Sequence, residues 1–95
     1  MNLNTIEEAI EECGEDIDYE GVGALLTLTF KNGTKIIINK QAPLHEIWVA
    51  TKFNGHHFSL NNEQWLDKRN GEELWQFLSS AINAQADINI SLSAN

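Results

Sequence analysis

Carboxylates dominate the first twenty residues of this chain. That segment holds 8 of the 14 Asp and Glu residues and none of the 6 Lys and Arg residues, so the net charge of -8 lies at one end. Such a charge attracts cations or a basic protein surface and repels phosphate groups. The composition therefore favours metal binding or contact with a basic protein. It argues against nucleic acid and against an anionic membrane as partners.

Seven of these acids are spaced so that they can act together. Helical spacing can bring Glu8, Glu11, Glu12 and Glu15 close to one another. Asp16, Asp18 and Glu20 occupy alternate positions of an extended segment. The absence of a closed set with Cys or paired His predicts weak, exposed sites for several cations, and oxygen ligands alone would accept Ca, Mn or Co as readily as iron. The alternative is a merely solvated charged face, which is what most charge runs form. The seven candidates are Glu8, Glu11, Glu12, Glu15, Asp16, Asp18 and Glu20.

Other groups with chemical potential are few. His56 and His57 could add imidazole ligands, although a histidine in a strand is more often structural. Cys13 is the single cysteine, so it forms no intrachain disulfide, and we expect a reducing, cytoplasmic setting and a buried thiol. No pairing of nucleophile and base and no phosphate-binding glycine loop is apparent, so we assign no catalytic residue.

The elements that must position these groups follow from hydrophobic periodicity. Leu3, Ile6, Ile10 and Cys13 share one face of a short N-terminal helix, which Asn4 or Thr5 would cap and Gly14 would end. A second helix is expected from a cap at Asn70 to about residue 84. The segment 87–92 alternates apolar and polar residues, and we expect it to lie over the two helices.

Between the helices the period changes to two, as in half-buried strands. Strands are predicted over residues 24–30, 34–39, 45–51 and 56–60, with 65–66 as a candidate fifth. Asn32-Gly33 predicts a type I′ turn, and Asn54-Gly55 marks another turn. This order predicts one α+β domain over residues 1–95, a two-layer sandwich with both helices on one face of an antiparallel sheet. Trp48, between Ile47 and Val49, would then lie on the open face as an anchor for a partner, or be shielded by its neighbours.

The strand region also resembles a known family. The stretches 26–30, 32–41 and 43–50, followed by Gly55-His56-His57-Phe58, Trp65 and Arg69-Asn70-Gly71-Glu72, are similar in order and spacing to the frataxin family, with the bacterial CyaY branch nearest. Two departures stand out, because the family's N-terminal helix is usually longer and an aromatic residue usually takes the place of His56.

The resemblance implies a frataxin-like fold and an acidic ridge that binds iron, Fe2+ or Fe3+. It implies a cysteine desulfurase and an iron-sulfur scaffold as partners, with a contact region that we place at Asn39, Lys40, Gln41, Pro43 and Trp48. The expected function is an iron donor or sensor in iron-sulfur cluster assembly that regulates the desulfurase, as a monomer and not as an enzyme. The alternatives are a ferroxidase or iron-storage protein with iron-driven oligomers, and an interaction module whose acids only maintain solubility.

Overall fold

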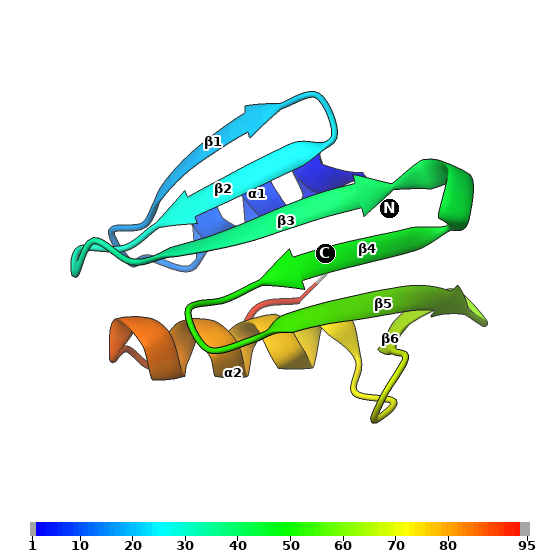
Figure 1. The fold of residues 1–95 in the computed structure, drawn as a ribbon. Coiled ribbons are helices and arrows are strands. Elements are labelled where there is room, and N and C mark those ends of the chain that lie inside the picture. Colours follow the sequence, from blue (N-terminus) through cyan, green and yellow to red (C-terminus); the bar gives the residue numbers. More distant parts are fainter. Residues whose placement is uncertain (1, 94–95) are drawn as a thin grey trace.

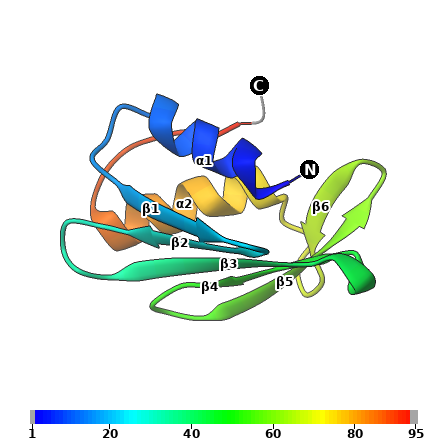
Figure 2. The same cartoon turned by 90° about the horizontal axis from the view of Figure 1, so that it is seen from above.

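The computed structural model describes residues 2–93 as two helices covering one face of a six-stranded antiparallel sheet. The strands follow one another as a meander, β1 to β6, and Figures 1 and 2 show both helices on the same side of it. The predicted two-layer α+β fold is therefore confirmed. The elements are α1 (Leu3–Glu12), β1 (Asp18–Val22), β2 (Leu25–Thr29), β3 (Lys35–Gln41), the 3-10 turn η1 (Ala42–Leu44), β4 (Glu46–Ala50), β5 (Gly55–Asn61), β6 (Gln64–Asp67) and α2 (Leu74–Ala86).

The core lies between the sheet and the helices. Alternate strand residues face the helices and are almost completely buried, among them Leu28, Ile38 and Ile47. They meet the apolar faces of the helices, for example Ile6 of α1 and Leu78 of α2, both at 0% exposure. Because each such side chain stabilises the fold by roughly 1.5–3 kcal/mol, the helices are held to one sheet face. The other sheet face, which we call the open face, remains available to solvent.

Strand β1 is an element that the sequence pattern did not predict. Residues 18–22 pair with β2 in the register Tyr19↔Leu28 and Gly21↔Leu26. As an edge strand it has one neighbour in the sheet, and three of its 5 residues are charged or glycine, namely Asp18, Glu20 and Gly21. A strand of this kind shows no apolar alternation, and its charges are typical of sheet edges.

The turn between β2 and β3 differs from the predicted type I′ turn. Only Gly33 of this loop has a positive φ, +84°, whereas a type I′ turn requires two such residues. The Gly33 amide donates to the Phe30 carbonyl at 2.9 Å, and the Phe30 amide donates to the Thr34 carbonyl at 3.0 Å. This is the longer hairpin loop in which a left-handed glycine follows the turn. Asn32 keeps a negative φ and instead donates through Nδ2 to the Gln85 carbonyl of α2 at 2.7 Å.

Both helices also begin at residues other than those predicted. Helix α2 begins at Leu74, and the Glu73 carboxylate caps it by accepting from the amides of Trp75 and Gln76. Asn70 instead accepts from the Glu72 amide in the preceding turn. Asp67, at the end of β6, holds this turn by donating its amide to the Glu72 carbonyl and accepting from the Gly71 amide. Helix α1 begins at Leu3 after Asn2, which makes no capping bond through its side chain. Its end agrees with the prediction, since Gly14 follows the last turn with φ +82°.

The C-terminal segment lies along the helices and does not join the sheet, as predicted. Asn83 of α2 exchanges two side-chain hydrogen bonds with the backbone of Ile90, and the Leu92 amide donates to Ser79 Oγ at 2.8 Å. Leu92 is only 5% exposed and lies next to Ala9 of α1 and Cys13, the residue after this helix. Within residues 2–93, neither helix has the length and hydropathy of a membrane-spanning helix.

Candidate metal ridge and partner face

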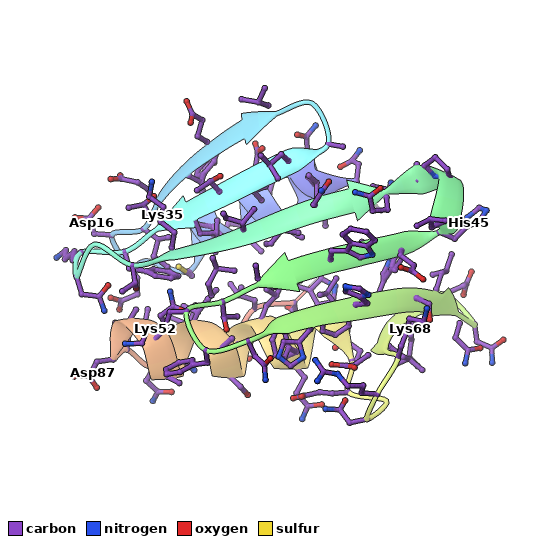
Figure 3. All side chains as sticks on the ribbon, viewed as in Figure 1. Asp16, Lys35, His45, Lys52, Lys68 and Asp87 are labelled. Carbon is purple, nitrogen blue, oxygen red and sulfur yellow. The ribbon has the colours of Figure 1, made fainter. Side chains whose placement is uncertain are left out.

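The seven predicted metal ligands are all exposed and follow one edge of the molecule. Three lie on α1, two in the loop after it and two on the edge strand β1. Figure 3 shows Asp16 at one end of the sheet, and Asp16 accepts a long ion pair of 3.8 Å from Lys31. We call these residues, Glu8, Glu11, Glu12, Glu15, Asp16, Asp18 and Glu20, the acidic ridge.

Strand alternation divides the ridge between the two sides of β1. Tyr19 and Gly21 face α1, since the Tyr19 hydroxyl donates to Glu11 and a methyl group added at Gly21 would lie 2.5 Å from Glu7 Oε2. Asp18 and Glu20 therefore point to the open face. In the part of the chain that the structure describes, no three His, Cys, Asp or Glu side chains converge on one point. The ridge consequently offers dispersed carboxylates and not a preformed cage.

Two residues beside the ridge were missed by sequence reasoning. Glu7 lies four residues before Glu11, so both carboxylates of this pair extend from α1 over β1. Tyr19 reaches the ridge because β1 is a strand. The hydrogen bond to Glu11, partial burial and the negative charges of Glu11 and Glu7 raise the pKa of the Tyr19 phenol. The place of Glu7 beside Glu11 could have been predicted from their helical spacing. The position of Tyr19 could not, because it depends on strand β1, which the sequence pattern did not predict.

Trp48 lies on the open face, as predicted from its buried neighbours Ile47 and Val49. Its indole N–H donates to Glu46 Oε1 at 2.7 Å, and its ring stacks on His57 with centroids 4.7 Å apart and planes 13° from parallel. Glu46 also accepts from Lys68 Nζ at 2.8 Å, and the bonds from Lys68 and Trp48 lower the pKa of Glu46. Figure 3 shows Lys68 at the end of the sheet opposite Asp16. The tryptophan is thus held in one orientation on the surface.

The other predicted contact residues divide between the faces. Asn39 is the register partner of Trp48, and Gln41 follows two positions later, so both share its face. Lys40 pairs with the buried Ile47 and lies on the helix side of β3, while Pro43 is exposed in the turn η1. The predicted contact residues therefore do not form one surface. Asn39, Gln41 and Trp48 share the open face, whereas Lys40 and Pro43 lie outside it.

Apolar side chains extend the open face beside Trp48. Leu25 and Ile37 are each 39% exposed there. With Asn39, Trp48 and His57 they line a shallow hollow of about 250 Å³. An apolar hollow next to a fixed tryptophan is a suitable surface for a protein partner.

His56 and His57 cannot bind one ion together, because they point to opposite faces of the sheet. His57 is exposed, whereas the His56 ring packs on Phe77, with centroids 4.4 Å apart, and its Nδ1 lies 2.9 Å from Asp67 Oδ2. Asp67 is 3% exposed and also accepts from the Arg69 amide at 2.8 Å. Although burial raises the pKa of Asp67, its bonds to the Arg69 amide and to His56 outweigh burial and lower it. Because adjacent strand residues alternate, each histidine could serve as an extra ligand only on its own face of the sheet.

Comparisons with known proteins agree with this architecture. Residues 2–88 match the family model described as a frataxin-like domain. The chain is 74% identical over 92 residues to the iron-sulfur cluster assembly protein CyaY of Colwellia psychrerythraea, which covers 97% of this chain and 87% of the relative. It is 53% identical over 89 residues to the CyaY of Pseudoalteromonas atlantica, covering 94% and 82% of the two chains.

Solved structures show the same fold. The frataxin of Psychromonas ingrahamii superposes with a TM-score of 0.86 at 51% identity, covering 95% of this chain and 86% of that one. A trimeric frataxin from the yeast Saccharomyces cerevisiae, complexed with ferrous iron, gives a TM-score of 0.68 at 30% identity and covers 90% and 79%.

Proposed function

Since this chain belongs to the frataxin family, in its bacterial CyaY branch, we propose that it binds iron on the acidic ridge and serves iron-sulfur cluster assembly. The observation that carries this proposal is the placement of seven exposed carboxylates along α1 and the adjoining edge strand. Carboxylates are oxygen donors that hold hard cations, and their mutual repulsion falls when a cation binds between them. The bound iron is cargo, held weakly by a changing subset of these side chains.

The same proposal assigns two protein partners to two surfaces. The acidic ridge complements a basic surface, which we assign to the cysteine desulfurase, because unlike charges steer association. The open face, with Trp48 fixed by Glu46 and flanked by Leu25 and Ile37, suits the iron-sulfur scaffold. The α1 part of the ridge and the open face lie on opposite sides of the sheet, so both partners can bind at once, although Asp18 and Glu20 of the ridge also border the open face. The protein then acts as an iron donor or sensor that regulates the desulfurase by occupying it.

The second candidate function is oxidation and storage of iron. The observation that favours it is the trimeric yeast frataxin complexed with ferrous iron, a related protein that oligomerises. A ferroxidase consumes oxygen in proportion to added Fe(II), whereas a regulator without catalytic activity consumes none above the buffer rate. We propose the regulator, because exposed carboxylates spread along α1 and β1 suit iron that is held weakly as cargo, and oxygen consumption with Fe(II) distinguishes the two functions.

An anaerobic titration with Fe(II), followed by amide NMR, tests the metal site. We expect selective broadening of amides in α1 and β1, with the amides of α2 unaffected. The test variant carries Glu8→Gln and Glu15→Gln, and the matched control carries Glu63→Gln and Glu72→Gln, so that each loses two negative charges. The ridge variant should bind Fe(II) about three- to tenfold more weakly, and the control should match the unmodified protein. Equal losses in both variants would show general charge attraction and would refute the ridge as a site.

A further inference from the structure

Two basic side chains lie beside the apolar hollow of the open face. Strand β6 pairs only with residues 58–61 of β5, and the chain then continues along β5, where the Lys68 amide donates to the His57 carbonyl at 2.9 Å. Lys68 and Arg69 thereby line a second hollow of about 300 Å³. Gly55 and His57 line both this hollow and the apolar one, so the two hollows are neighbours.

Both basic side chains are held in place by bonds that leave donors available. Lys68 Nζ donates to Glu46 Oε2 at 2.8 Å, and Arg69 Nη2 donates to the Gly55 carbonyl at 2.6 Å. An ammonium group carries three N–H donors and a guanidinium group five, so each side chain can donate to a further acceptor. Because they are already ordered, they lose less conformational entropy when a partner binds.

The carboxylates nearest to these cations lie beneath them. The Glu46 side chain is 13% exposed and the Asp67 side chain 1%. The Lys68 side chain is 52% exposed, and Arg69 is also exposed. The bonds from Lys68 and from Trp48 lower the pKa of Glu46, which keeps this carboxylate ionised and paired. An approaching protein therefore meets the two cations before it meets their counter-charges.

The opposite edge of the open face carries negative charge. Asp18 and Glu20 of β1 border that edge, and the exposed Leu25 and Ile37 lie between it and Trp48 on the intervening strands. Across the sheet, the open face is thus acidic at β1, apolar over β2 to β4 and basic beyond β5. A surface with this order of charges distinguishes the two directions in which a partner could lie on it.

We propose that Lys68 and Arg69 recognise carboxylates of the partner on the open face, so that this partner docks in a single orientation. The inference rests on the proposed docking of the iron-sulfur scaffold and adds the charge that the scaffold presents beyond β5. In the reverse orientation the same carboxylates would approach Asp18 and Glu20, and like charges in contact oppose association. The apolar hollow supplies contact area, and the cations supply the direction.

Association and dissociation rates with the iron-sulfur scaffold test this orientation. The test variant carries Lys68→Gln and Arg69→Gln, and the matched control carries Lys31→Gln and Lys35→Gln, so that each loses two positive charges. Figure 3 shows Lys35 and Lys68 at opposite ends of the sheet. The association rate should fall about three- to tenfold in the test variant, with a smaller change in the dissociation rate, because charges at the rim of an interface steer the encounter. The control should match the unmodified protein.

Salt dependence separates steering from a displaced tryptophan. Lys68→Gln also removes a bond to Glu46, which holds the Trp48 ring. If lost steering is the cause, high salt should bring the association rates of the unmodified protein and the test variant together, since salt screens exposed charges. A difference that persists unchanged at high salt would show a structural effect on Trp48 and would overturn the inference.

The outcomes separate this inference from the proposed function. If the scaffold binds the unmodified protein and Trp48→Ala weakens binding, but the test variant and the control associate equally fast, the charge recognition is refuted while scaffold docking stands. If the scaffold does not bind the unmodified protein, both fail. If the protein alone sediments as oligomers that the test variant loses, the recognised carboxylates belong to a second copy of this chain, and the inference is refuted.

Discussion

Replacing Asp67 by Ala should destabilise the protein more than any change on its charged surface. The carboxylate is 3% exposed and accepts two hydrogen bonds, from the Arg69 amide at 2.8 Å and from His56 Nδ1 at 2.9 Å. Bonds to a charged acceptor each contribute about 1.5 kcal/mol or more, and their loss leaves two donors unpaired near the core. We therefore expect the free energy of unfolding to fall by about 3 kcal/mol. In a domain of this size that is a large part of the total stability.

Urea unfolding followed by circular dichroism measures this change. The control is Asp16→Ala, because its 3.8 Å ion pair with Lys31 is exposed and should contribute less than about 0.5 kcal/mol. The pKa of Asp67 is lowered in the folded state, so its contribution is present above the unfolded pKa near 3.9 and is lost as pH falls through the folded value. A loss below about 1 kcal/mol at neutral pH would show that the pair is not a structural link between β5 and β6.

Three further outcomes follow from the contacts described above. Leu92→Ala should lower the free energy of unfolding in urea by about 2–3 kcal/mol, because the buried contact of the C-terminal segment with the helices is lost. Ser91→Ala, at the exposed neighbouring position, is the control and should change the free energy of unfolding little. The Tyr19 phenol should titrate above pH 10 in NMR, because its pKa is raised in the folded protein. Its contribution to stability is therefore present below about pH 10 and declines as the pH rises further. Titration of the phenol at or below pH 10 would contradict the bond to Glu11. Glu46→Ala should shift the indole N–H signal of Trp48 without altering the far-UV spectrum, and an unchanged indole signal would show that the 2.7 Å bond does not hold the ring in solution.

Periodic patterns predicted the buried strands and the two helix faces because their apolar residues repeat at the spacing of the element. Strand β1 was not predicted, because an edge strand that packs under the carboxylates of α1 shows no such apolar repeat. The link between His56 and Asp67 depends on the register of the β5–β6 hairpin, in which Phe58 lies opposite Asp67. The turn at Asn32-Gly33 took another form because Asn32 binds the end of α2, a contact 53 positions away.

The candidate ridge was predicted more completely than its internal contacts. Charge counting and residue spacing together selected seven carboxylates, all of which are exposed, since eight acids without a base in twenty residues leave few arrangements. The orientation of Glu11 toward Tyr19 could not be predicted, because it requires helix and strand to be packed together. Adjacent histidines could have been placed on opposite faces from strand alternation alone.

The position of β1 at the sheet edge gives the ridge charges a second effect. Its outer backbone groups form a border at which another strand could add, and Asp18 and Glu20 line that border. Like charges on two approaching copies repel each other, so the iron-free protein resists edge-to-edge aggregation. Neutralising the same carboxylates with cations removes this repulsion. The aggregation threshold of the protein should therefore fall as its metal load rises.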